Sequence, residues 1–138
     1  MPTPPPQPEK MSEKTLTELV KNALRNTGWR SAHFHDSRRQ VKPGVFIGDS
    51  AAKGFPDIVA VRRTRLLVAE LKSDKGKFRD GQEGWLDAFT CVGAEVFVWR
   101  PEHWNSDAIW DVINAANRLP QSRLAKKDYG LWTPREPC

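Results

Sequence analysis

Two short apolar runs near the middle of the chain give the first prediction. Residues 58–61 read Ile-Val-Ala-Val and residues 66–69 read Leu-Leu-Val-Ala, with a short basic stretch between them. Runs of this length that are rich in Val, Ile and Leu are typical of buried β-strands, and the short connection predicts a β-hairpin. Residues 29–35 and 95–99 carry weaker patterns that predict two further strands.

Apolar residues recur at helical spacing in three other segments. A helix is predicted over residues 13–26, with Ser12 as its N-cap and Gly28 as its end. Further helices are predicted from about residue 80 or 81 to 92 and from about 106 to 118. The expected buried stripes are Leu16, Leu19, Val20, Ala23 and Leu24 in the first helix, Trp85, Leu86 and Phe89 in the second, and Ile109, Trp110, Val112 and Ile113 in the third.

The remaining segments divide the chain into one domain with polar ends. Residues 1–11 are rich in proline and are expected to form a disordered leader. The domain is expected to span residues 12–119, and residues 120–138 to form a basic tail. Residues 36–53 are expected to be a long loop with brief order at 45–47. The order helix, strand, hairpin, helix, strand, helix predicts an α/β fold with a mixed sheet flanked by helices.

The register of the hairpin places charged residues at one end of it. A loop centred on residues 63 and 64 pairs residue 59 with 68 and puts Asp57 directly opposite Glu70, with Lys72 on the same face. Opposed side chains lie about 5 Å apart, so the two carboxylates repel each other unless a cation lies between them. The hairpin therefore predicts a divalent metal site with an ammonium group beside it. A loop one residue longer or shorter would send the carboxylates to opposite faces.

Five short motifs follow one another in a fixed order. They are Gly54-Phe55-Pro56-Asp57, Glu70-Leu71-Lys72-Ser73, Lys75-Gly76-Lys77, Gln82 followed by Trp85-Leu86, and Gly93-Ala94-Glu95-Val96. Together with residues 33–38, they resemble the PD-(D/E)XK nucleases, especially the small stand-alone phage and bacterial members of the VRR-NUC branch. The resemblance covers roughly residues 13–113. The sequence departs from the family at residues 79–82, which lack the common Ser or Thr cap, and at Gly84 inside the helix.

The resemblance implies a restriction-endonuclease-like αβββαβ core and metal-dependent hydrolysis of DNA. Asp57, Glu70 and the main-chain carbonyl of Leu71 would hold Mg²⁺ or Mn²⁺, ions that prefer oxygen ligands. A glutamate on the first helix would complete the site, with Glu18 as the favoured candidate and Glu13 as its competitor.

Two further side chains are expected to act beside the metal ligands. The ammonium group of Lys72 would hold the attacking water or the scissile phosphate, and without substrate it would form a salt bridge to one of the carboxylates. Gln82 would either meet a DNA phosphate at the start of its helix, cap that helix, or brace Lys72. For His33 and His35, a packed or hydrogen-bonded role is favoured over general-base catalysis.

The charge of the chain favours a nucleic-acid partner. The net charge is +5 and the pI is about 9.5, and a basic surface attracts nucleic acid. Small members of the resembling branch are associated with junction or flap cleavage, and the twofold symmetry of a four-way junction suits a homodimer. Arg62, Arg63 and Arg65 either touch DNA or form a solvated edge, and base stacking is left open for Trp132 alone. The expected DNA contacts are Ser37, Arg38, Arg39, Lys53, Lys75 and Lys77.

Composition also argues against membrane-spanning, secreted and cysteine-rich proteins. The sequence has no long apolar run and no signal-peptide pattern, so a cytoplasmic protein with no membrane partner is expected. Cys91 and Cys138 show no metal-ligand spacing and are not expected to form a disulfide, with Cys91 in the core and Cys138 exposed. Three rival functions stay open: a restriction-like or nicking endonuclease on duplex DNA, a catalytically silent DNA-binding module, and a phage adaptor protein.

Overall fold

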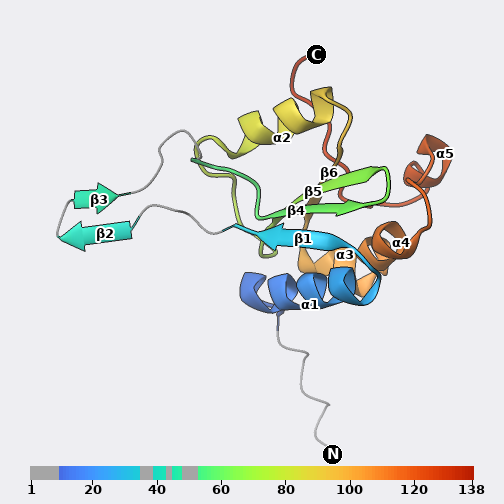
Figure 1. Ribbon diagram of the computed structural model, residues 1–138, viewed down its shortest axis with the longest axis horizontal. Coiled ribbons are helices and arrows are strands. Elements are labelled where there is room, and N and C mark those ends of the chain that lie inside the picture. The colour runs from blue at the N-terminus through green and yellow to red at the C-terminus, as the bar shows by residue number, and fades with distance from the viewer. Residues whose placement is uncertain (1–9, 35–38, 43–44, 48–52) are drawn as a thin grey trace, which may run out of the picture.

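The computed structural model describes residues 10–34, 39–42, 45–47 and 53–138. A four-stranded sheet lies at its centre, with α2 on one face and α1, α3 and α4 on the other (Figure 1). The elements in chain order are α1 (Glu13–Asn26), β1 (Arg30–His33), β2 (Arg39–Lys42), β3 (Val45–Ile47), β4 (Ile58–Arg62), β5 (Arg65–Leu71), α2 (Gln82–Cys91), β6 (Glu95–Trp99), α3 (Pro101–Asn105), α4 (Ala108–Asn114) and α5 (Gln121–Leu124).

The central sheet is mixed, as the sequence predicts. Its strand order is β1-β4-β5-β6, in which β1–β4 and β4–β5 are antiparallel and β5–β6 is parallel. The β4–β5 hairpin has the predicted register, because Val59 lies opposite Val68 and Val61 lies opposite Leu66. This register determines which face the charged residues at the end of the hairpin occupy.

Each face of the sheet carries its own apolar core. Leu67 and Ala69 of β5 pack with α1 and α4, whereas Val68 packs on the opposite face with α2. This explains why the hairpin strands are apolar on both faces. Glu70 and Lys72 follow Val68 at two-residue spacing, so they lie on the face that α2 covers.

The first helix has the predicted bounds. Ser12 caps α1 by accepting a hydrogen bond from the Thr15 N–H at 3.1 Å. The predicted apolar face is buried, apart from Leu19, which is half-buried. Gly28 follows with a φ of 84°, a conformation that glycine adopts without strain, and the chain turns there into β1. Of the helices in the described parts of the chain, none is both long and apolar enough to cross a membrane.

Four local predictions differ from the structure. In the segment 36–53, β3 agrees with the order expected at 45–47, but β2 was expected to be loop, and the two strands pair with each other apart from the main sheet (Figure 1). The helix predicted over 106–118 is shorter, because α4 spans only Ala108–Asn114, and the separate helix α3 precedes it, with Asp107 at a left-handed φ of 64° between the two. Trp110 is 42% exposed, since α4 buries Ile109, Val112 and Ile113 on its other side. The predicted stripe of α2 is only partly buried, with Leu86 inside and its two aromatic residues half-exposed.

Two arginines at the tip of the hairpin have a structural role that the sequence did not show. Arg65 is buried and pairs with Glu95 of β6 through two N···O contacts of 2.7 and 2.8 Å. Arg62 and Arg65 also donate hydrogen bonds to main-chain carbonyls at the end of α4, which a helix leaves without partners. Both guanidinium groups lie over the Trp29 ring. Arg63 remains exposed at the tip.

The segment after α5 lies along β6. The Val98 N–H donates to the Gly130 carbonyl at 2.8 Å, and the Trp132 N–H donates to the Val96 carbonyl at 2.8 Å. Tyr129 is buried in the core beneath it. The basic tail predicted over 120–138 therefore includes a part that packs against the sheet.

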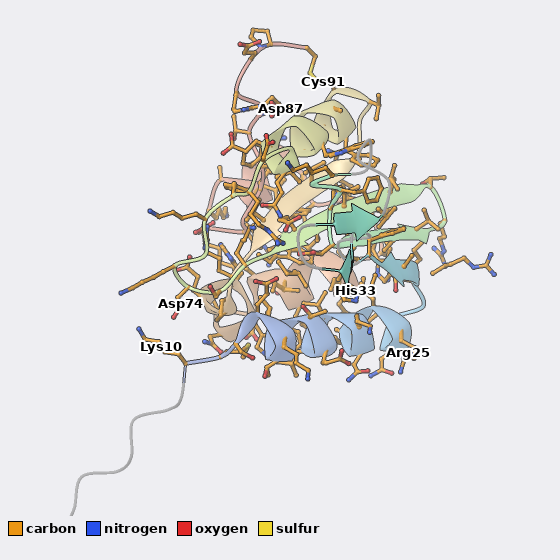
Figure 2. All side chains as sticks on the ribbon, turned by 90° about the vertical axis from the view of Figure 1, so that its left-hand side faces the viewer. Lys10, Arg25, His33, Asp74, Asp87 and Cys91 are labelled. Atoms are coloured by element: carbon orange, nitrogen blue, oxygen red, sulfur yellow. A yellow bond between two sulfur atoms is a disulfide. The ribbon has the colours of Figure 1, made fainter. Side chains whose placement is uncertain are left out.

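A disulfide joins Cys138 to Cys91 at the end of α2 (Figure 2). The Cα atoms of the two cysteines are 5.5 Å apart, and Cys91 is exposed. The predictions of two unpaired cysteines and of a buried Cys91 are therefore wrong. The two residues are 47 positions apart, and nothing in the spacing shows that the tail returns to α2.

Candidate metal centre

The candidate site lies where β4 begins and β5 ends, beside the N-terminus of α2. Asp57 directly precedes β4, and Glu70 is the penultimate residue of β5, so the hairpin register brings the two carboxylates opposite each other. Asp57 is held on two sides. Its Oδ2 accepts a hydrogen bond from the Leu71 N–H at 2.8 Å, and its main-chain carbonyl accepts one from the Phe34 N–H at 2.7 Å.

Glu70 is 1% exposed, and its two carboxylate oxygens have different surroundings. Oε1 accepts a hydrogen bond from Gln82 Nε2 at 3.0 Å and lies 3.7 Å from Lys72 Nζ. No donor among the described residues reaches Oε2. Burial, with the adjacent Asp57 charge, raises the pKa of Glu70 to about 8. Without a cation, Glu70 therefore keeps its proton at neutral pH.

Lys72 and Gln82 form a buried network around Glu70. Lys72 is 4% exposed and donates through Nζ to Gln82 Oε1 at 2.7 Å. The same Gln82 oxygen accepts the Arg79 N–H at 2.7 Å, in the turn before α2, whose start has no side-chain cap. Of the roles considered for Gln82, the structure shows the brace on Lys72. With its side chain 3% exposed and turned inward, the amide presents no surface to a DNA phosphate.

A close approach of two glycines places the start of α2 at this site. A Cβ on Gly54 would lie 2.4 Å from the carbonyl carbon of Gly81, and a Cβ on Gly81 would lie 2.5 Å from the Lys53 carbonyl oxygen. Both glycines have positive φ, 79° and 87°. The segment before Asp57 therefore crosses directly against the turn that carries Gln82, and a side chain at either glycine would push the two apart.

Two glutamates of α1 lie near the carboxylate pair. A hollow of about 450 Å³, here called the Asp57 hollow, is lined by Glu13, Glu18 and Asp57, and also by Lys14, Phe34 and Arg79. Glu18 has a side chain that is 59% exposed and lies 3.5 Å from Lys21. Glu13 is the one whose charge helps to raise the pKa of Glu70. The structure thus places both glutamates at the hollow and does not decide which of them would complete the metal site.

A divalent ion fits the donor set at the end of the hairpin. When Glu70 is ionised, its Oε2 is a buried acceptor that no donor among the described residues reaches, and Asp57 lies opposite it. Two adjacent carboxylates offer hard oxygen ligands that suit Mg²⁺ and Mn²⁺, and an ion there would replace the proton that Glu70 otherwise keeps. Leu71, whose carbonyl is the expected third ligand, is the last residue of β5 and donates its N–H to Asp57. It therefore lies beside the two carboxylates.

The expected DNA contacts are distributed around the site. Lys53 is exposed and pairs with Asp80 at 3.1 Å. Lys75 and Lys77 are exposed in the loop after β5, where they line a second hollow of about 500 Å³. Arg100 holds this loop by donating to the carbonyls of residues 73 and 76 at 2.7 and 2.8 Å. His35, Ser37 and Arg38, and the side chain of Arg39, lie outside the described residues.

Trp132 is not available as a stacking platform. Its indole N–H donates to Asp87 Oδ1 at 2.8 Å, and its ring contacts Phe78 edge-on at a centroid distance of 5.5 Å. The indole N–H and the ring of Trp132 therefore both make structural contacts, and the bond to Asp87 attaches the tail to α2. His33 has an interaction partner and lines the Asp57 hollow.

A second cluster of possible metal ligands lies at α3 and consists of Glu102, His103 and Asp128. His103 Nδ1 accepts a hydrogen bond from the Arg100 N–H at 2.9 Å, so the proton of the neutral ring is on Nε2. Nε2 lies 3.1 Å from Asp128 Oδ1. A metal ion needs a lone pair at that nitrogen, and the cluster is therefore better explained as a helix cap with a close polar contact to Asp128.

Sequence reasoning missed an aromatic group beside the site. Phe55 contacts Phe34, Trp85 and Phe89 edge-on, at centroid distances of 4.9, 4.9 and 5.8 Å. Two of these residues were expected in a helix core and Phe55 only as part of a motif. The positions of Phe55 two residues before Asp57 and of Trp85 three residues after Gln82 were the available signal. Only the fold shows that β1 brings Phe34 to the same place.

Comparison with known proteins does not assign a family. No protein-family model matches the chain, and no match is found among the curated proteins or the solved structures.

Proposed function

We propose that the protein is a metal-dependent endonuclease that hydrolyses phosphodiester bonds in branched DNA, such as four-way junctions or flaps. The observation that carries the proposal is the buried Glu70 carboxylate, which faces Asp57 and has an oxygen that no described donor reaches. Glu70 is buried beside the half-buried Asp57, and the two carboxyl groups can both be ionised only if a cation offsets their charges. A carboxyl group whose pKa is raised by burial and by a neighbouring carboxylate is a candidate for a functional site.

The motifs and the topology support a nuclease in particular. Asp57, Glu70 and Lys72 match the PD-(D/E)XK motif, and the strands of the main sheet with their helices follow the order α1, β1, β4, β5, α2, β6. That order is helix, three strands, helix, strand, which is the αβββαβ core that the resemblance implies. The mixed sheet and its two helical layers are compatible with this core.

The roles of the residues follow from their contacts. Asp57 and Glu70 would hold Mg²⁺ or Mn²⁺, together with the Leu71 carbonyl and a glutamate of α1, either Glu13 or Glu18. A bound ion supplies an activated water and stabilises negative charge on the phosphate. Lys72 holds its ammonium group beside Glu70, where it can offset charge that develops on the scissile phosphate.

Gln82 is a positioning residue in this proposal. Its amide oxygen binds Lys72 Nζ and its amide nitrogen binds Glu70 Oε1, so it fixes the distance between the ammonium group and the carboxylate. A side chain that is buried and bonded on both ends has little freedom to move. The arrangement is therefore set before DNA or metal binds, which reduces the reorganisation that catalysis requires.

The surroundings of the site support DNA as the substrate. Lys75 and Lys77 extend from the loop that directly follows Lys72, and Lys53 lies on the segment before Asp57. Exposed lysines of this kind contact phosphates without reading sequence, so we propose recognition of DNA shape. A homodimer is part of the proposal because a four-way junction has approximate twofold symmetry. A cytoplasmic location is also part of the proposal, since DNA is accessible there.

The test is cleavage of end-labelled DNA. The purified protein is incubated with a four-way junction, a 5′ flap, a single strand and a linear duplex, each with Mg²⁺, Mn²⁺ or EDTA. We expect metal-dependent cutting of a branched substrate. Asp57→Asn and Lys72→Met should each slow the cutting by about 100-fold or more, since they remove charges that act on the reacting phosphate.

The control is Lys126→Met, which removes an exposed lysine of the tail far from the hairpin along the chain. It should cut like the wild type, while all variants keep a cooperative thermal transition. Cutting of the linear duplex as fast as the branched substrates would favour a restriction-like or nicking enzyme. Undiminished cutting by Asp57→Asn would contradict the assignment of the site, and binding without cutting under every metal would point to a DNA-binding module.

A further inference from the structure

One aromatic side chain at the candidate site is exposed without a structural reason. Phe34 directly follows β1, and 41% of it is open to solvent. Its ring contacts Phe55 edge-on at a centroid distance of 4.9 Å. Such a contact holds one part of a ring and leaves the rest uncovered. The other three members of the aromatic group are half-buried, so Phe34 is the exposed end of that group.

Phe34 is fixed in position relative to the metal ligands. Its N–H donates to the main-chain carbonyl of Asp57 at 2.7 Å, and its ring leans on Phe55, two residues before Asp57. Phe55 is in turn held by Trp85 at 4.9 Å. The exposed ring is therefore attached through its main chain and its side chain to the segment that carries the catalytic carboxylate.

The space in front of the ring has the size of a nucleotide. The Asp57 hollow has a volume of about 450 Å³, and its lining includes Phe34, the cations Lys14 and Arg79, and the carboxylates Asp57, Glu13 and Glu18. Hollows of about this size hold small ligands, whereas a DNA duplex is far too wide to enter. Its contents would lie between an aromatic ring, two cations and the carboxylates that hold the metal ion.

A cationic surface lies next to this hollow. His33 lines both the Asp57 hollow and a neighbouring hollow of about 500 Å³ between α1 and β1. Lys21, Arg25 and Arg30 line the second hollow, and Figure 2 shows Arg25 near the C-terminal end of α1, with His33 beside the helix. An aromatic ring followed by a row of cations is the pattern by which proteins bind one strand of nucleic acid.

We propose that the Asp57 hollow is a nucleotide subsite, in which an unpaired base next to the cut position stacks on Phe34. The inference rests on the proposed nuclease function and names the residue that would receive the base. Base stacking on an aromatic side chain tolerates every base, so the subsite selects for local unpairing rather than for sequence. The phosphates of the same strand would pass Lys14 and Arg79, with Lys21, Arg25 and Arg30 beyond His33.

The test combines two protein variants with a modified substrate. Phe34→Ala removes the ring, and Phe34→Tyr keeps an aromatic face. The matched control is Trp110→Ala on α4, because Trp110 is 42% exposed and lies outside the Asp57 hollow. The substrate is the DNA that the wild type cuts best, either intact or with one abasic nucleotide placed in turn at each of the three positions on either side of the cut.

The expected result is a loss that depends on both partners. Loss of one base stack corresponds to about a 10- to 100-fold fall in kcat/KM, so an abasic nucleotide at one position should slow the wild type by that factor. Phe34→Ala should slow cutting of intact DNA by the same factor and show no further loss with the abasic substrate. Phe34→Tyr and Trp110→Ala should both behave like the wild type.

A binding measurement separates this inference from the nuclease proposal. With 2-aminopurine at the sensitive position and EDTA present, the fluorescence of the bound DNA should be lower with the wild type and Phe34→Tyr than with Phe34→Ala, because stacking on an aromatic ring quenches this base. Normal cutting by Phe34→Ala, or a loss that adds to that of the abasic nucleotide, would overturn the stacking role alone. Failure of the wild type to bind or cut any DNA would overturn both proposals.

Discussion

The carboxyl group of Glu70 gives the most quantitative prediction, because its burial should make the metal-free fold less stable as pH rises. Burial and the Asp57 charge raise its pKa from 4.5 to about 8. A tenfold change in an acid dissociation constant corresponds to about 1.4 kcal/mol. The rise therefore corresponds to about 5 kcal/mol that folding loses when Glu70 must be ionised.

The direction follows from which state binds the proton. Below pH 4.5 Glu70 is protonated in both the folded and the unfolded chain, so it has no effect. Between pH 4.5 and 8 the unfolded chain releases the proton and the folded chain keeps it, so the free energy of unfolding falls as pH rises. From pH 5 to pH 8 the fall attributable to Glu70 should be about 3 to 4 kcal/mol.

The assay is urea unfolding in EDTA at pH 5, 6, 7 and 8, for the wild type and for Glu70→Gln. Glutamine keeps the shape and cannot ionise, so the variant should lose this part of the pH dependence. Glu136→Gln, in the exposed tail, is the matched control and should follow the wild type. Mg²⁺ should restore wild-type stability at pH 8 and should not restore the variant. Parallel pH profiles for wild type and Glu70→Gln would refute the reasoning.

Four further substitutions test three separate parts of the structure. Cys91→Ser opens a 47-residue loop and should reduce the free energy of unfolding by up to about 4 kcal/mol, yet cutting should persist because the site lies at the other end of α2. Arg65→Met should destabilise by about 3 to 5 kcal/mol in thermal unfolding, since it leaves Glu95 buried and unpaired; normal stability would contradict the account. Glu13→Gln and Glu18→Gln compared in Mn²⁺ titrations should show which glutamate completes the site, and unchanged affinity in both would exclude α1.

The hairpin shows how far the sequence alone could lead. Its register follows from two apolar runs and a short join, and this register is what places Asp57 opposite Glu70. The bounds of α1 and β6 were also predictable, because each has a clear cap or breaker and a regular apolar pattern. The part of the site that depends on spacing within one hairpin was therefore accessible without a structure.

Other parts depend on contacts between distant segments. Arg62 and Arg65 resembled a basic DNA-binding tip, but the fold brings the end of α4 and Glu95 to them. The partner of Cys91 is 47 residues away along the chain. Gln82 had three possible roles, and only the close crossing of the two glycine turns shows which of them it fulfils. Local sequence patterns carry no information about contacts between segments that are distant along the chain.

The most direct measurement of the central claim is titration of Mn²⁺ into the protein by calorimetry at pH 7, in two buffers with different enthalpies of ionisation. The account predicts a Mn²⁺ site that releases about 0.9 proton on binding, because a carboxyl group with a pKa of about 8 is mostly protonated at pH 7. Asp57→Asn and Glu70→Gln should abolish that site. Equal Mn²⁺ binding in both variants, or binding without proton release, would contradict a metal centre at the end of the hairpin.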